Sequence, residues 1–235
     1  MESVVTAPER AAAMEALAGE AAGCRRCPQL VESRSQVVFG SGPADAELML
    51  VGEAPGASED REGLPFVGAS GKLLDTLLEG IGLSRGRVFI ANVLKCRPPE
   101  NRNPRPEEVA NCSPWLESQL EVVSPALVVS LGNFATRLLR GDAAGIGKVH
   151  GQVEEVSVGA RLVRLYPVFH PAAALYRRPN LEVLEADFAR IPELLALGPV
   201  EQPEPQAPAA PEAKDGDGVP EESPGRRDDG QMGLF

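Results

Sequence analysis

The chain is poor in aromatic residues and histidine, and several sequence signatures are absent from it. No run of eighteen apolar residues occurs, so we expect no transmembrane helix. The first residues lack a basic region followed by an apolar stretch, so we expect no secretory signal and a cytoplasmic protein. Two histidines are too few for a histidine cluster that binds metal, and no GxxxxGK(S/T) pattern indicates phosphoryl transfer.

Acidic residues outnumber basic ones, and the net charge of −11 argues against a surface that is basic throughout. Residues 201–235 hold nine acidic and three basic residues, which is more than half of that excess. A DNA-binding face must therefore be local. The candidate cations, each equally consistent alone with a solvated surface charge, are Lys95, Arg97, Arg102 and Arg105 in one loop, and Lys148, Arg177 and Arg178 elsewhere.

The composition divides the chain into a folded domain and a tail. From about residue 200 to 230 the sequence is rich in Pro, Glu, Gly, Asp and Ala, with no aromatic residue. Such a segment cannot bury enough apolar surface to offset the entropy lost on ordering. We therefore expect a domain over residues 1–199 and a disordered, acidic, proline-rich tail over 200–235.

Within the domain, apolar runs alternate with segments of helical periodicity. The runs predict strands over 47–51, 87–94, 126–131 and 162–169, with residues 153–158 as one arm of a hairpin. Helices are predicted from Ser70, from Pro106 and over 181–197. This alternation predicts an α/β fold with a mostly parallel sheet covered on both faces, and ligands bind such sheets at the carboxyl ends of the strands.

The four cysteines are Cys24 and Cys27, in a CRRC pair, and Cys96 and Cys112. Four thiolates suit one tetrahedral metal ion or one iron–sulfur cluster. An even number of cysteines also permits disulfides, but a chain of this size without a secretory signal favours metal ligation. Zinc and an iron–sulfur cluster both remain open on spacing alone.

Four polar or aromatic residues lie at or near the expected strand ends. Glu53, in the turn GEAPG, could hold a water molecule, although the turn alone is a weak signal. Phe66 lies between two glycines and could stack on a base, whereas most phenylalanines belong to a core. Asn92 could read the edge of a heterocycle or simply fix the backbone. His170 could donate to an oxygen that gains negative charge, or be structural.

Taken together, the segments GEAPG, GLPFVG, NVLKCRPPENRNPRPEE, LGNFA and FHPA resemble the uracil-DNA glycosylases of the iron–sulfur, family-4 type. The resemblance covers roughly residues 20–195. It implies a three-layer α/β/α fold with a four-stranded parallel sheet, and a 4Fe–4S cluster held by the four cysteines. It also implies a monofunctional enzyme that hydrolyses the N-glycosidic bond of uracil in DNA, in base excision repair of deaminated cytosine.

The resemblance also assigns roles to individual residues. It makes Glu53 and His170 catalytic, the first placing the attacking water and the second facing the uracil O2. It assigns five substrate-binding positions, namely Gly52 and Ala54 by their backbone, Glu59 near C5 of the base, Phe66 by stacking and Asn92 by reading the uracil edge. Ala54 stands where family-1 enzymes carry a water-activating Asp, so the identity of the general base is open.

The terminal peptide gives a separate indication of a partner, and two other functions remain as alternatives. The terminal peptide Gln231–Phe235 resembles the Gln-x-x-Leu-Phe peptide by which bacterial repair enzymes bind the replicative sliding clamp. We expect a monomer that binds single- or double-stranded uracil-containing DNA in association with the nucleoid. The alternatives are an iron–sulfur or zinc DNA-binding module without catalysis, and a glycosylase for another deaminated base.

Overall fold

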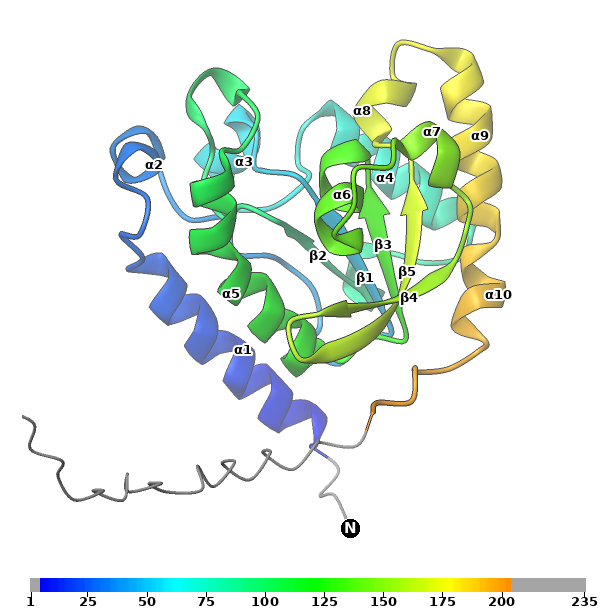
Figure 1. The fold of residues 1–235 in the computed structure, drawn as a ribbon, viewed down its shortest axis with the longest axis horizontal. Helices are drawn as coiled ribbons and strands as arrows, with labels where there is room; N and C mark the ends of the chain where they lie inside the picture. Colours follow the sequence, from blue (N-terminus) through cyan, green and yellow to red (C-terminus); the bar gives the residue numbers. More distant parts are fainter. Residues whose placement is uncertain (1–4, 204–235) are drawn as a thin grey trace, which may run out of the picture. The chain divides into compact units, whose positions relative to one another are not determined.

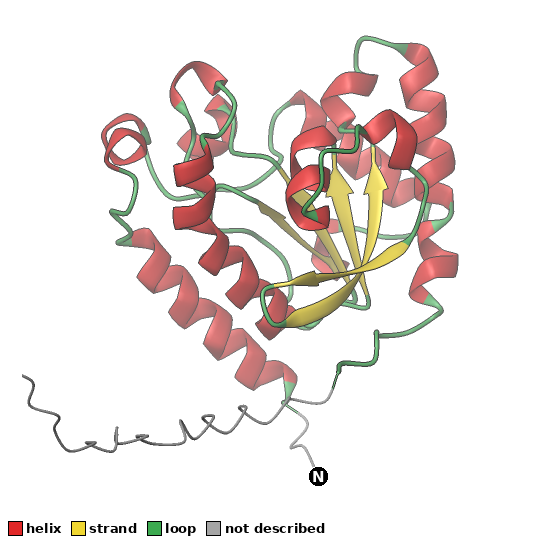
Figure 2. Ribbon diagram, viewed as in Figure 1, coloured by secondary structure: helices red, strands yellow, loops and turns green. Residues whose placement is uncertain are grey.

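The computed structural model describes residues 5–203, so the Gln231–Phe235 peptide and nearly all of the predicted tail lie outside the described residues. Figure 2 shows helices on both sides of a central sheet. The α-helices are α1 (Ala7–Ala22), α2 (Pro28–Ser33), α3 (Ala57–Glu62), α4 (Ala69–Gly80), α5 (Pro106–Val123), α6 (Asn133–Arg140), α7 (Ile146–Val149), α8 (Pro171–Ala174), α9 (Arg178–Ala189) and α10 (Ile191–Leu195). Two 3-10 turns are η1 (Arg85–Arg87) and η2 (Pro99–Asn101).

The sheet contains four parallel strands, as predicted, and one additional antiparallel strand. Its strands are β1 (Leu48–Gly52), β2 (Val88–Asn92), β3 (Leu127–Leu131), β4 (Glu154–Val158) and β5 (Arg161–Val168). Their order is β2-β1-β3-β5-β4, and only the β4–β5 pair is antiparallel. The predicted hairpin arm therefore becomes β4, which extends the sheet at one edge.

Alternating residues of the strands build two separate cores, one on each face of the sheet. In β1, Met49 and Val51 pack with α1, α5 and α6, whereas Leu48 and Leu50 pack with α4, α9 and α10. Figure 1 shows α1 and α5 side by side over one face and α9 beyond the other. The three-layer α/β/α architecture is thus confirmed, because a strand exposes successive side chains to opposite faces.

The carboxyl-terminal part of the domain differs from the prediction in two details. The single helix predicted over 181–197 is two helices, α9 and α10, because Pro192 has no N–H to continue the hydrogen bonding of α9. Packing also continues past residue 199. Val200 is buried, and Gln202 exchanges two hydrogen bonds with the backbone of Leu162.

The strand order places a topological switch point between β1 and β3. The chain passes from β1 to its neighbour β2 on one side, and then to β3 on the other side. Crevices form at such points outside the carboxyl ends of the strands. In this sheet those ends carry Gly52, Asn92, Leu131 and Val168. None of the helices between residues 5 and 203 combines the length and apolar character needed to cross a bilayer.

Candidate active site and cysteine cavity

A cavity of about 430 Å³ opens at the carboxyl ends of the parallel strands, within the size range of small-molecule sites. Six of the seven predicted catalytic and substrate-binding residues line it, namely Glu53, Ala54, Glu59, Phe66, Asn92 and His170. The loop after β2 supplies part of the wall through Pro98 and Arg102. The structure therefore brings together residues separated by more than a hundred positions in the sequence.

Asn92 ends β2, and its side chain lines this cavity. The residue is 2% exposed, and its Oδ1 has no hydrogen-bond partner within the described part of the chain. A buried acceptor without a partner is unfavourable unless a ligand completes it. Its backbone carbonyl, by contrast, accepts a hydrogen bond of 2.8 Å from Lys95 Nζ. The strand end is thus fixed, while the amide oxygen has no partner among the described residues.

Gly52, the seventh predicted residue, lies directly behind Asn92 and Phe66. A Cβ atom added to Gly52 would lie 2.4 Å from Asn92 Oδ1 and 2.7 Å from Phe66 Cζ. Real Cβ atoms do not approach other atoms so closely. Glycine is therefore required at this position because both side chains pack against the end of β1.

His170 is held in one tautomer by the helix that it begins. The backbone N–H of Ala172 donates to His170 Nδ1 at 3.0 Å, so the neutral ring carries its proton on Nε2. Burial lowers the pKa of His170 to about 4, against a weaker opposing effect of Glu59. At neutral pH the residue is therefore an uncharged hydrogen-bond donor.

The His170 ring is placed by close packing on two sides. It stacks on Phe66 with ring centroids 5.6 Å apart and an interplanar angle of 27°. On the other side is Gly132, at φ +87°, where an added Cβ would lie 2.7 Å from His170 Cβ. A side chain at position 132 would therefore displace the imidazole.

Two carboxylates of the cavity have different surroundings. Glu53 follows β1, and burial raises the pKa of its carboxyl group. Glu59, in α3, accepts hydrogen bonds of 2.9 Å at Oε1 from the backbone N–H groups of Val67 and Gly68. It was predicted to lie near C5 of a base; the structure places it in the cavity wall and also in contact with the backbone next to Phe66.

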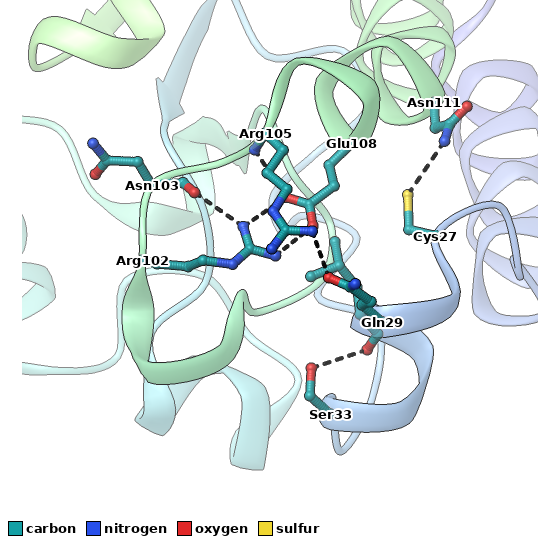
Figure 3. Close-up of polar contacts among 9 residues, drawn as sticks. Cys27, Gln29, Ser33, Arg102, Asn103, Arg105, Glu108 and Asn111 are labelled. Carbon is teal, nitrogen blue, oxygen red and sulfur yellow. Dashed lines mark hydrogen bonds and ion pairs between the residues drawn. The ribbon is translucent and has the colours of Figure 1, made fainter.

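The basic loop after β2 is tied to α5, which contains Cys112, and to α2, which directly follows Cys27 (Figure 3). Arg102 donates two hydrogen bonds to Glu108, whose side chain is 5% exposed, and the N–H of Arg105 donates to the same carboxylate. The Arg105 side chain donates to Gln29 of α2. One wall of the cavity is therefore anchored to both α2 and α5.

One expected surface cation is in fact internal. Lys95 was predicted among the loop residues that could contact DNA, but it is 1% exposed. Its Nζ donates to the Asn92 carbonyl and to Gln119 Oε1, and burial lowers the pKa of Lys95 to about 8. The prediction for Lys95 is wrong because its side chain turns inward under the end of β2. Arg177, Arg178 and Lys148 are exposed, as a surface role requires.

All four cysteines line one small cavity between α1, α2, α5 and the loop after β2. Burial raises the pKa of Cys112 to about 11 and raises the pKa values of Cys27 and Cys96. Binding of a metal group would therefore release protons, because thiolates are the ligands. Among residues 5–203, no three cysteine, histidine or acidic side chains are arranged to hold a single metal ion.

Hydrogen-bond donors surround these sulfur atoms. Arg34 donates to Cys96 Sγ at 2.9 Å and the Lys95 N–H donates to Cys112 Sγ at 3.3 Å. Asn111 Nδ2 lies 3.7 Å from Cys27 Sγ (Figure 3). Trp115 lines the same cavity, and its buried Nε1 has no partner in the described chain. Donors around thiolates suit a negatively charged iron–sulfur centre, so this donor set fits the predicted group.

Sequence reasoning missed several residues of these two sites. Arg85 donates to the carbonyls of Pro65 and Phe66, and Gln119 donates to the Phe39 carbonyl while accepting from Lys95. No motif marks these residues, because they act through backbone groups that are distant in the sequence. The unpartnered Trp115 is the single tryptophan of the chain, which is the one signal that could have drawn attention to it.

Comparisons with known proteins identify the family of this chain. The family model of the uracil DNA glycosylase superfamily matches residues 39–191. A type-4 uracil-DNA glycosylase of Saccharolobus solfataricus is 42% identical over 80% of this chain and 88% of its own length. One of Archaeoglobus fulgidus is 46% identical over 74% and 89%, and one of Thermotoga maritima is 41% identical over 71% and 85%. The chain therefore belongs to the uracil DNA glycosylase superfamily.

Proposed function

We propose that the protein removes uracil from DNA by hydrolysing the N-glycosidic bond, as the name of its relatives, type-4 uracil-DNA glycosylases, indicates. The observation that carries this proposal is the buried side chain of Asn92, which lines a cavity together with His170 and Phe66 and whose Oδ1 has no partner among the described residues. An oxygen acceptor and an amide donor on one side chain match the N3–H and O4 of uracil. Cytosine presents an amino group and an unprotonated N3 at this edge, so the same amide orientation rejects it.

The reaction begins when uracil leaves the base stack and enters the cavity. Extrusion costs a few kcal/mol, and least for a mismatched or unpaired base. Phe66 stacks on the base and Asn92 holds its edge. The exposed cations Arg177, Arg178 and Lys148 are available for the DNA phosphates, whose contacts supply affinity rather than base specificity.

In the chemical step the bond between N1 and C1′ breaks, its electron pair moves onto uracil, and water adds to C1′ while its released proton passes through solvent to the uracil anion. The neutral His170 donates from Nε2 to O2, where negative charge develops, without a proton leaving the imidazole. Glu53 holds the attacking water, and Glu59 helps to exclude the methyl group of thymine. The support for these roles is the common cavity and the tautomer fixed by Ala172.

We propose that Cys24, Cys27, Cys96 and Cys112 hold a 4Fe–4S cluster rather than zinc. The four thiols share one cavity, and Arg34 and the Lys95 N–H donate to two of the sulfur atoms, which suits a negatively charged iron–sulfur centre. When bound, the cluster supplies metal–thiolate cross-links between the segment before α2, the loop after β2 and α5. Visible charge-transfer absorption with about four irons per chain supports this assignment, and a colourless protein containing zinc contradicts it.

Incubation with single- and double-stranded DNA containing uracil, followed by alkaline cleavage of abasic sites, tests the function. We expect breaks at uracil and none at thymine or cytosine. Absence of breaks favours a DNA-binding module without catalysis. Breaks at hypoxanthine or xanthine, but not uracil, favour a glycosylase for another deaminated base.

We propose further that the terminal peptide Gln231–Phe235 binds the replicative sliding clamp. We also propose that the enzyme is a monomer and is associated with the nucleoid. Apolar side chains return there after a long polar stretch, which is typical of a segment that folds on binding. Deletion of residues 231–235 is expected to abolish capture of the clamp and to leave uracil release from short duplexes unchanged. Clamp capture that survives the deletion contradicts the proposal, and size-exclusion chromatography with light scattering tests the monomer.

A further inference from the structure

Phe66 occupies a backbone conformation that a bulky residue rarely adopts. Its φ is +55°, in the left-handed region, where non-glycine residues are strained. Gly71, in the first turn of α4, makes this possible, because a Cβ at Gly71 would lie 1.7 Å from the Phe66 carbonyl oxygen. A conformation of this kind persists only where surrounding groups hold it.

A guanidinium group supplies part of that restraint by holding the carbonyl of Phe66 and the carbonyl that precedes it. Arg85, in η1, donates from Nη1 to the carbonyl of Pro65 at 2.9 Å and from Nη2 to the carbonyl of Phe66. Its Nε donates to Asp75 of α4 at 2.5 Å, which orients the fork. Two successive carbonyls are thus held by one planar group, a geometry that a lysine ammonium cannot reproduce.

On the C-terminal side, the carboxylate of Glu59 accepts from the N–H groups of Val67 and Gly68. The backbone is therefore fixed on both sides of the aromatic ring. Glu59 itself lines the cavity, so its substitution would change both the cavity wall and the backbone next to Phe66. Arg85 forms no part of the cavity wall among the described residues and reaches the cavity only through Phe66. Substitution of Arg85 therefore tests the placement of Phe66 without changing the cavity wall.

We propose that Arg85 is a positioning residue for base recognition, which fixes the Phe66 ring against the bound pyrimidine. The proposal rests on the proposed function and deepens it. Stacking of a base on an aromatic ring contributes ~1–3 kcal/mol, which corresponds to roughly 5- to 150-fold in binding. Loss of the guanidinium leaves the ring present but poorly placed, so part of that factor is lost.

A double-mutant cycle between R85Q and F66A tests the proposal on the full-length holoenzyme. The readouts are kcat and KM on a uracil-containing duplex and the inhibition constant of free uracil. R85Q is expected to lower kcat/KM about tenfold, mostly through KM and with a matching loss of inhibition by uracil. In the F66A background, R85Q is expected to cost less than twofold. R87Q removes a charge from the exposed neighbouring arginine of the same turn and is expected to leave all constants unchanged.

The outcomes distinguish failure of the positioning role of Arg85 from failure of the proposed function. Equal losses from R85Q in both backgrounds contradict the positioning role, and so does a loss confined to kcat. A wild-type holoenzyme that releases no uracil contradicts the proposed function itself. If R85Q does not yield folded protein, D75N replaces it in the double-mutant cycle with F66A. It keeps the guanidinium but removes the carboxylate that orients it, and an effect independent of Phe66 contradicts the proposal.

Discussion

Replacing His170 with leucine removes the one hydrogen-bond donor that we place at the uracil O2. Leucine fills a similar volume beside Phe66 but offers no N–H. Removal of one donor of this kind typically lowers kcat ~10²–10³-fold, or about 2.7–4 kcal/mol of transition-state stabilisation. Because the donor acts on charge that develops in the reaction, KM is expected to change little. Single-turnover release of uracil from a labelled oligonucleotide measures the effect.

The pH profile gives this prediction a second, independent part. The pKa of His170 is lowered to about 4, so the residue stays neutral through the range in which an exposed histidine titrates. The pKa of Glu53 is raised by burial from 4.5, so its carboxylate is protonated as the pH falls through that raised value. We therefore expect activity to fall on the acid side because of Glu53, and E53Q to abolish that limb.

Two results would refute this reasoning. The first is an inflection of kcat near pH 6.5 that disappears in H170L, which would mean that a titrating, exposed imidazole takes part. The second is a kcat of H170L within threefold of the wild type, with normal folding by circular dichroism.

Three further predictions concern the cavity, the cysteines and the loop between them. G52A places a methyl group 2.4 Å from Asn92 Oδ1 and is expected to lower uracil release about 10²-fold; single-turnover rates within threefold of wild type contradict this. W115F removes an unpartnered N–H and is expected to make the cluster's reduction potential more negative in an EPR-monitored titration; an unchanged potential argues that the indole does not donate to it. E108Q breaks the contact with Arg102 and is expected to lower the free energy of unfolding by roughly 1–3 kcal/mol at pH 7. Because the pKa of Glu108 is lowered from 4.5, mainly by Arg102, this deficit should shrink as the pH falls below that value; a deficit in urea unfolding that does not depend on pH contradicts the account.

The strands and their faces could be predicted because each strand is a short apolar run followed by a polar or glycine-rich turn. Placement of Glu53, Asn92 and His170 at one edge follows, because parallel strands end at the same edge. For residues 153–158 the sequence predicted a hairpin arm but not its pairing with β5 at the sheet edge. The break between α9 and α10 could have been predicted from Pro192, which cannot donate a backbone hydrogen bond.

Contacts that depend on side-chain direction could not be predicted. Lysine is a residue type found mostly at surfaces, yet the Lys95 side chain is buried and its Nζ donates to the Asn92 carbonyl. Arg85 is an ordinary cation in the sequence, and only the fold places it under the Phe66 backbone. Both depend on backbone carbonyls, which leave no trace in residue type or spacing.

The account depends most on the reading of uracil by the amide of Asn92, and the single-turnover release of uracil by N92L measures it directly. Leucine has a similar volume and neither donor nor acceptor. The two hydrogen bonds to the base edge form one bidentate contact worth ~1–3 kcal/mol, so release is expected to fall roughly 5- to 150-fold. Release by folded N92L within threefold of the wild type would contradict the claim that this cavity recognises uracil.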